Sequence, residues 1–148
     1  MLRRNVESQG GAVVKTIGDA IMGAFPSLEA GFQAALGILQ DIDAYNAEHT
    51  GWPLHLRLGL NSGPALVVTL NGQLDYFGSM VNLAAKLERY SRGNEIVLPQ
   101  ALLAMLNVPD EVWETEQLTV SITGEDELLP VVRMRPKCRG GLLAQREE

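Results

Sequence analysis

Apolar and polar residues follow two different patterns in the first third of the chain. Two short apolar runs, residues 12–17 and 20–25, flank Gly18-Asp19, which predicts two paired strands joined by a tight turn. From Ser27 to about residue 49, apolar side chains recur at the spacing of an amphipathic helix, and Ser27 is a favourable N-cap residue. The pattern therefore predicts a hairpin followed by a long helix.

The rest of the chain alternates strand patterns with helical patterns. Asn71-Gly72 follows an apolar run and is a strong hairpin signal. The predicted elements are strands at 54–60, 65–70, 95–98, 112–122 and 128–134 and helices at 79–90 and 99–106. This order indicates an α/β (α+β) protein with a ferredoxin-like antiparallel sheet and covering helices on one side of the sheet.

Size and composition indicate one globular domain. The chain has 148 residues, of which 46% are hydrophobic and 20% charged, which is enough for one buried core. We expect residues 1–135 to form this domain. Residues 136–148 are polar and contain glycine, so we expect a flexible C-terminal tail.

Charge and cysteine content exclude several classes of protein. A net charge of −6 argues against nucleic acid as a partner, because phosphate contacts require clustered Lys and Arg. No apolar run approaches the ~20 residues of a membrane span, and the N-terminal residues do not form a signal peptide. The single Cys138 excludes an intrachain disulfide and a Cys-rich metal site. We therefore expect a cytoplasmic protein without a membrane segment.

Four blocks of sequence resemble the catalytic domain of class III adenylate and guanylate cyclases. The blocks are Gly11–Phe25, Leu56–Pro64, Leu74–Leu87 and Gly93–Val97, in the order of the family and near its spacing. The resemblance implies conversion of ATP to 3′,5′-cyclic AMP and pyrophosphate. It also implies two Mg²⁺ or Mn²⁺ ions and a head-to-tail homodimer with two sites at its interface.

Asp19 is the metal-binding residue that the resemblance implies. Members of the family use two aspartates to hold the two metal ions, which activate the 3′-hydroxyl of ATP and neutralise its phosphates. Asp19 matches the second of these aspartates. From the residues alone, Asp19 is equally a good residue for a hairpin turn.

Lys15 and Asp75 match the two positions that read the base in this family. The lysine donates to a ring nitrogen of adenine and the aspartate accepts from the exocyclic amine, a pairing that guanine does not satisfy. Guanylate cyclases have Glu and Cys at these two positions. The resemblance therefore implies that Lys15 and Asp75 select ATP. The alternative is a solvated strand lysine and a loop aspartate.

Asn82, Lys86 and Thr123 match three further positions, two of them with departures from the family. Asn82 matches an asparagine that orients the ribose. Lys86 stands where the family has an arginine, and Lys lacks the planar fork that binds phosphate with two hydrogen bonds. Thr123 stands where the family usually has a lysine that meets the terminal phosphate. A surface position is the alternative for both.

The third departure concerns the first metal aspartate, which the family carries on an N-terminal strand. Residues 1–10 contain no Asp, and Glu7 is read as the end of a helix. We therefore expect a cyclase fold that lacks its first strand and helices. This departure leaves a second hypothesis open, a non-catalytic domain that acts in nucleotide binding, dimerisation or regulation.

The histidines and tryptophans are predicted to have structural roles. His49 ends the long helix and His55 lies on the polar side of an alternating strand, so neither is expected to be a catalytic base. Trp52 and Trp113 are interpreted as packing or loop residues rather than as a stacking platform for a base.

Overall fold

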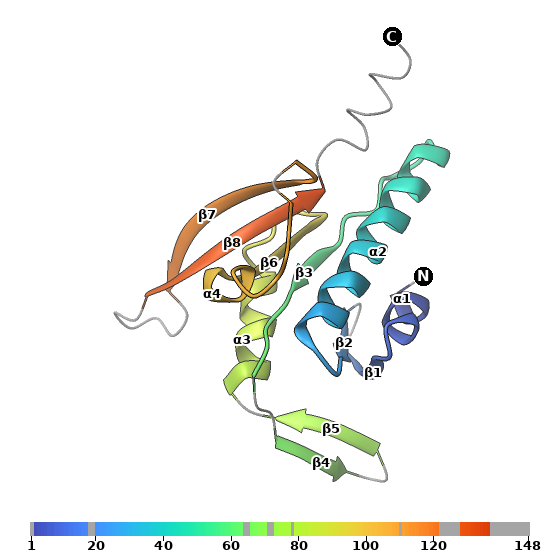
Figure 1. Ribbon diagram of the computed structural model, residues 1–148. Helices are drawn as coiled ribbons and strands as arrows, with labels where there is room; N and C mark the ends of the chain where they lie inside the picture. The colour runs from blue at the N-terminus through green and yellow to red at the C-terminus, as the bar shows by residue number, and fades with distance from the viewer. Residues whose placement is uncertain are drawn as a thin grey trace.

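The computed structural model describes residues 2–17, 20–63, 66–70, 73–77, 79–109, 111–121 and 128–136. The structure describes the backbone, and not the side chains, of residues 17, 66–70, 73–77 and 79–81. The helices are α1 (Leu2–Ser8), α2 (Leu28–Glu48), α3 (Ser79–Glu88) and α4 (Gln100–Leu103) (Figure 1). The strands are β1 (Ala12–Ile17), β2 (Ala20–Ala24), β3 (Arg57–Gly59), β4 (Leu66–Leu70), β5 (Gln73–Phe77), β6 (Glu95–Pro99), β7 (Trp113–Ser121) and β8 (Leu128–Pro136).

The central sheet of the described residues has four strands in the order β3-β6-β8-β7 (Figure 1). Strands β6, β8 and β7 pair antiparallel, whereas β3 and β6 pair parallel. Strands β1 and β2 form one separate hairpin, and β4 and β5 form another. The predicted mixture of helices and antiparallel hairpins is confirmed. The parallel pair differs from the expected antiparallel sheet. The chain leaves β3, passes through hairpin β4-β5 and α3, and enters β6 in the direction of β3, so the two strands are joined by a crossover.

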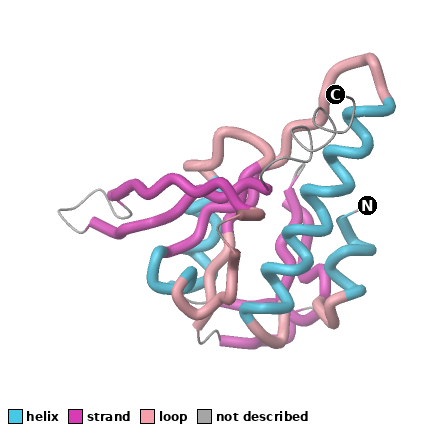
Figure 2. Tube along the Cα trace, turned by 45° about the horizontal axis from the view of Figure 1, so that its top comes forward, coloured by secondary structure: helices cyan, strands magenta, loops and turns pink. Residues whose placement is uncertain are grey.

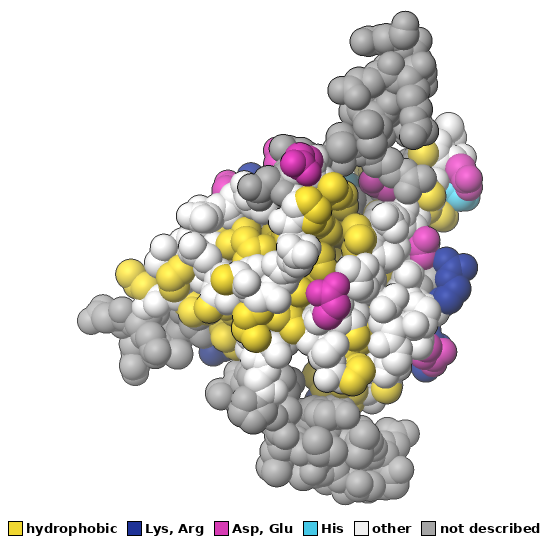
Figure 3. Space-filling view, viewed as in Figure 1, with side chains coloured by type: hydrophobic (Ala, Val, Ile, Leu, Met, Phe, Trp, Pro, Cys, Tyr) yellow, Lys and Arg dark blue, Asp and Glu magenta, His cyan; other side chains and the backbone are white. Residues whose placement is uncertain are grey.

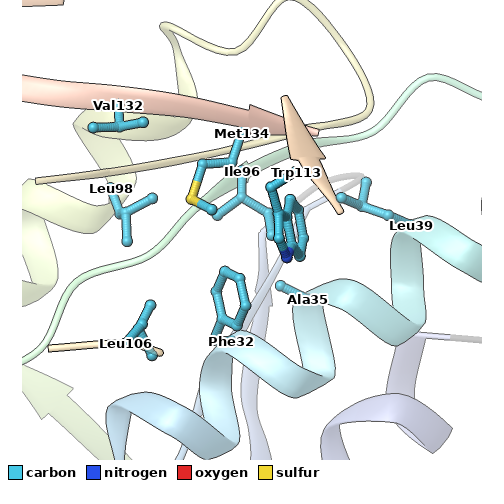
Figure 4. Close-up of a cluster of buried hydrophobic side chains, with 9 residues drawn as sticks. All are labelled: Phe32, Ala35, Leu39, Ile96, Leu98, Leu106, Trp113, Val132 and Met134. Carbon is cyan, nitrogen blue, oxygen red and sulfur yellow. The ribbon is translucent and has the colours of Figure 1, made fainter. Parts of the chain in front are cut away.

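Helix α2 covers one face of the central sheet with an apolar stripe. Its first turn begins at Ser27, whose hydroxyl accepts a hydrogen bond from the backbone N–H of Ala30 at 3.1 Å. The rings of Phe32 and Trp113 meet with their centroids 5.0 Å apart (Figure 4). The buried cluster on this face consists of Phe32, Ala35, Leu39, Ile96, Leu98, Leu106, Trp113, Val132 and Met134.

Helix α3 packs against the opposite face of the sheet. Its Leu87 is fully buried and clusters with Val97, Val120 and Val131. Val97 lies between Ile96 and Leu98 on β6, and successive residues of a strand point to opposite faces. The helices therefore cover both faces of the central sheet, where the sequence pattern predicted one.

Gly59 lets α3 approach β3 closely. A Cβ atom at this position would overlap the carbonyl oxygen of Ala84 and lie 2.7 Å from the backbone nitrogen of Glu88. Both atoms belong to the backbone of α3 and cannot move aside as a side chain could. The absence of a side chain at Gly59 thus sets how closely the helix lies on the sheet.

Helix α1 lies alongside α2 on the outside of the molecule (Figure 2). Val6 of α1 is buried, and the Asp41 carboxylate accepts hydrogen bonds from Arg4 and Asn5, each at 2.8 Å. These two hydrogen bonds, with the charge of Arg4, hold the pKa of Asp41 below its usual value. Glu7 lies in the last turn of α1, as predicted.

Strand β3 is shorter than the predicted strand over residues 54–60. The backbone N–H of Leu54 donates to the side-chain oxygen of Asn46 at 2.8 Å, and the N–H of Leu56 donates to that of Asn94 at 2.9 Å. Asn94 has a φ of 57°, so its backbone turns into β6 at this point. The side-chain amides thus take the backbone groups that a longer strand would have paired.

The helix predicted at 99–106 is shorter in the structure, where it is α4. After Leu103 the backbone continues in tighter turns, in which Met105 donates to Leu102 and Leu106 to Leu103. Strand β8 runs on through Arg135 and Pro136, and residues 137–148 lie outside the described residues. None of the described helices combines the length and apolar composition that a membrane crossing requires.

Candidate functional site

Strand β5 contacts two other elements that carry predicted site residues. It carries Asp75 at the register position opposite Val68 of β4. It contacts β1, which precedes it in the sequence, and α3, which follows it. The segments that meet at β5 therefore carry Lys15, Asp75, Asn82 and Lys86.

Lys15 is half-buried and follows an irregularity in hairpin β1-β2. Val13 pairs with Gly23 and Lys15 pairs with Met22, so Val14 is an extra residue on β1. Such a bulge bends the strand and redirects the side chain beside it, and bulges are common next to functional sites. The apolar run over residues 12–17 gave no sign of this bulge in the sequence.

Asn82 and Lys86 lie four residues apart on α3, so they share one face of the helix. Asn82 is exposed and Lys86 is half-buried, whereas the neighbouring Leu83 and Leu87 pack on the sheet. Glu88 holds the end of the helix to Arg57 of β3 through an ion pair at 3.6 Å. The apolar pair fixes the rotation of α3 and leaves Asn82 available to a ligand.

The remaining predicted site residues are not covered by the description. Asp19 and Thr123 lie outside the described residues, and Asp75 is described by its backbone. The roles of these residues stay predictions. Within the described ranges, no three His, Cys, Asp or Glu side chains come close enough together to hold a metal ion.

The predicted structural roles of His49 and Trp113 agree with the structure. The His49 ring stacks on Tyr45 with centroids 3.9 Å apart, and the residue forms the C-cap of α2. Trp113 is buried in the core with 4% of its surface exposed. His55 is exposed, and Trp52 is 94% exposed in the loop after α2, so neither packs in the core.

A buried carboxylate on β6, missed in the sequence, ties α3 to the sheet. The side chain of Glu95 is 2% exposed, and its Oε2 accepts hydrogen bonds from Arg92 and Arg135, each at 2.9 Å. The backbone N–H of Arg92 donates to the other oxygen at 2.8 Å. Burial alone would raise the pKa of Glu95, but the hydrogen bonds outweigh burial and lower the pKa from 4.5 to about 2.

The same cluster extends to β7 and to the turn after α3. Arg133 donates to the backbone oxygen of Tyr90 at 2.7 Å and to Glu116 at 3.0 Å. We call Arg92, Glu95, Glu116, Arg133 and Arg135 the charged cluster. It fixes the C-terminal end of the helix that carries Asn82 and Lys86. A sequence signal existed in the spacing of Arg133 and Arg135, although the predicted strand ended at residue 134 and so left Arg135 out.

Comparison with known proteins gives the chain a family context. The family model for the adenylate and guanylate cyclase catalytic domain matches residues 1–132. An uncharacterised protein of Mycobacterium tuberculosis (strain H37Rv) is 40% identical over 101 residues, which are 68% of this chain and 24% of that protein. An adenylate cyclase of Anabaena cylindrica is 25% identical over 146 residues, covering 88% of this chain and 29% of the relative. The chain thus spans about a quarter of the length of these curated relatives.

Solved structures show the same fold. The crystal structure of an adenylate/guanylate cyclase/hydrolase from Silicibacter pomeroyi matches with a TM-score of 0.77. The match covers 93% of this chain and 80% of that chain at 24% sequence identity. At this identity the likeness concerns the path of the backbone and not the ligands.

Proposed function

The chain belongs to the adenylate and guanylate cyclase catalytic domain family, and we propose that it is the catalytic domain of an adenylate cyclase. Such an enzyme converts ATP to 3′,5′-cyclic AMP and pyrophosphate. The observation that carries the proposal is the position of β5, which contacts both β1 and α3. The strand that carries Lys15 therefore lies beside the strand that carries Asp75, although the two are far apart in the sequence, and α3 with Asn82 follows β5 directly.

Recognition of adenine is the first step that the proposal assigns. Lys15 would donate a hydrogen bond to a ring nitrogen, and Asp75 would accept one from the exocyclic amine. Guanine presents an oxygen where adenine has its amine, so it would face the Asp75 carboxylate with an acceptor. The half-buried position of Lys15 after the bulge supports this role, because partial burial strengthens a charged hydrogen bond.

Asn82 and Lys86 are assigned to the ribose and the phosphates. Asn82 is exposed on α3, and its amide can both donate to and accept from the ribose. Lys86, one turn later, would place its positive charge near the phosphates. Thr123 would add an uncharged hydroxyl donor near the terminal phosphate. Because an ammonium group does not form the bidentate contact of a guanidinium, this arrangement predicts slow turnover.

Metal binding is proposed through Asp19. Its carboxylate, predicted in the turn between β1 and β2, suits Mg²⁺ or Mn²⁺, both of which prefer oxygen ligands. When bound, such ions neutralise phosphate charge and activate the attacking hydroxyl. The described residues supply no further ligand cluster, so the proposal rests on Asp19 and on the family.

A head-to-tail homodimer completes the proposal. One protomer would supply Asp19, and the other would supply Lys15, Asp75, Asn82 and Lys86. ATP is the substrate partner, and the cytoplasm, where ATP is made available, is the proposed location. A closed two-fold dimer would contain two such sites.

A second candidate is a non-catalytic domain that binds a nucleotide and regulates a partner. Lys86 favours this candidate, because it replaces the arginine on which the family's transition-state stabilisation depends. This domain would bind ATP without turning it over.

Formation of cyclic AMP separates the two candidates. The purified protein is incubated with ATP and Mn²⁺, and cyclic AMP is quantified by chromatography for the wild type and for Asp19→Ala. The adenylate cyclase proposal predicts product from the wild type and a loss of at least about 100-fold in the variant, the scale of losing a main transition-state contact. Equal product from both proteins would remove Asp19 from the mechanism. Binding of ATP without product would favour the second candidate.

A further inference from the structure

Strand β8 carries an arginine on the face of the sheet that α3 covers. Val132 and Met134 pack in the buried cluster beneath α2, whereas Val131 packs in the cluster beneath α3. Because successive residues of a strand point to opposite faces, Arg133 lies on the α3 face. The α2 side of the molecule differs in character, since hydrophobic side chains gather beside α2 and Lys and Arg are few there (Figure 3). The alternation along β8 thus directs this guanidinium toward α3.

Arg133 secures the turn that ends α3. Its side chain is 18% exposed, its Nε donates to the backbone oxygen of Tyr90 at 2.7 Å, and its Nη1 donates to Glu116 at 3.0 Å. The Tyr90 hydroxyl donates to the backbone oxygen of Ser121 at 3.1 Å, so Tyr90 is held at both ends. Carbonyl groups at the end of a helix lack partners within the helix, and a cation there also interacts favourably with the helix dipole.

The secured turn is bonded directly to the part of α3 that carries Lys86. The backbone N–H of Arg89 donates to the backbone oxygen of Lys86 at 3.2 Å, and that of Tyr90 donates to Leu87 at 3.0 Å. The structure gives the Lys86 side chain no hydrogen bond or ion pair with any other described residue. The backbone of α3, and not a partner of its own, therefore sets where the charge of Lys86 lies.

We propose that Arg133 is a positioning residue, which acts through the Tyr90 carbonyl to fix the place of Lys86 relative to the phosphates of the nucleotide. The inference rests on the proposed function, which assigns Lys86 to the phosphates. The ammonium group of a lysine stands at the end of a flexible four-carbon stem, so a small rotation of the last turn displaces it. Misplacement of a reacting group by about 1 Å costs up to about 100-fold in rate.

A cycle of single and double variants tests the proposal with the purified protein, radiolabelled ATP and Mn²⁺. Arg133→Gln removes the guanidinium, and we expect it to lower kcat roughly 10-fold with less than about 2-fold change in KM. In a Lys86→Gln background the same substitution should change kcat by less than about 2-fold, since the group that Arg133 positions is absent. A loss of folded protein would instead lower kcat by the same factor in both backgrounds.

Two further variants separate positioning from folding. Arg133→Lys keeps a positive charge and one donor at a time, so its kcat should lie between those of the wild type and Arg133→Gln. Arg4→Gln removes a hydrogen bond from an arginine to a carboxylate elsewhere, at Asp41 between α1 and α2, and should leave kcat unchanged.

Amide hydrogen exchange reports on the turn itself in protein without nucleotide. The N–H groups of residues 89–91 donate to the last carbonyls of α3. They should exchange at least about 10-fold faster in Arg133→Gln, because the turn opens more often, and at the wild-type rate in Arg4→Gln.

Two results overturn the inference and leave the proposed function intact. The first is a fall in kcat by the same factor with and without Lys86. The second is an unchanged kcat in Arg133→Gln, whatever its exchange rates. Absence of cyclic AMP from the wild type is a different result, because it overturns the proposed function and, with it, the assignment of Lys86 on which the inference rests.

Discussion

We propose that Lys86 occupies the position where the family has an arginine. It lies one turn after Asn82 on α3, with its charge retained but without a guanidinium fork. A lysine at this position can neutralise phosphate charge, but it holds one oxygen where an arginine would hold two. The expected result is a site that binds nucleotide well and stabilises the transition state poorly.

Restoring the arginine tests this interpretation. We expect Lys86→Arg to raise kcat by roughly 10- to 100-fold with little change in KM, because the lysine keeps its charge and so loses only part of the roughly 100- to 1,000-fold that one transition-state donor contributes. Initial rates of cyclic AMP formation over a range of ATP concentrations measure both constants. Arg89→Lys, exposed on the turn after the same helix, is the control and is expected to change neither. An unchanged or lower kcat in Lys86→Arg would contradict the role of Lys86.

Single residues were predicted from sequence with unequal success, and the reason is the distance of their partners along the chain. Trp52 and Trp113 were both predicted to be packing or loop residues, but the sequence did not separate Trp113, which lies tilted against Phe32 in the core, from Trp52, which is exposed in a loop. Glu95 was missed because Arg135 contacts it from forty residues away. Local patterns reveal which face of an element is apolar, but not which charged groups meet across elements.

At the scale of elements, the charged cluster joins the end of α3 to β6, β7 and β8. Glu95 is buried among these elements, so its charge is stabilised by Arg92 and Arg135 and hardly by water. Its pKa lies at about 2, below the ordinary value of 4.5, so folding favours the ionised form. The stabilisation is complete above about pH 4.5 and is lost as the pH falls toward 2.

Unfolding by urea as a function of pH measures this contribution. We expect Glu95→Gln to lower the free energy of unfolding at pH 7 by on the order of 3 kcal/mol, the equivalent of the pKa change. The variant should also lose less stability than the wild type between pH 4.5 and pH 2. Glu48→Gln, at the exposed end of α2, should behave as the wild type does. Parallel stability curves for Glu95→Gln and the wild type would contradict the assignment.

Most elements were predictable because each carries its own signal. The Ser27 cap and the apolar stripe of α2 needed no distant partner. Strand β3 was overpredicted because Asn46 and Asn94, which lie on other elements, bind the backbone of Leu54 and Leu56. The bulge at Val14 was invisible for the same reason, since only pairing with β2 defines it.

At the scale of the whole molecule, the arrangement of elements around β5 could be predicted only through the family resemblance. Periodicity separates strands from helices, but it does not place α2 and α3 on opposite faces of the sheet or pair β3 with β6 in parallel. Packing decides the placement of the helices: Gly59 admits α3 to one face, and Phe32 and Trp113 bring α2 to the other.

The proposed dimer makes a prediction of its own. Asp19→Ala and Asn82→Ala should each abolish cyclic AMP formation when assayed alone. After the two variants are mixed in equal amounts and allowed to exchange subunits, about one quarter of wild-type activity should return. Half of the dimers are then mixed, and each mixed dimer keeps one intact site of two. No recovery in dimers shown by mass spectrometry to be mixed would contradict a site shared between protomers.

We propose that Lys15 and Asp75 together read the base, and the binding of ATP and GTP to the wild type and to Lys15→Glu with Asp75→Cys tests this role. Isothermal titration calorimetry measures all four affinities without requiring turnover. We expect the wild type to prefer ATP and the double variant to prefer GTP. Loss of a matched pair of hydrogen bonds should shift the ratio of affinities by at least about 10-fold. The same preference for ATP in both proteins would contradict the account.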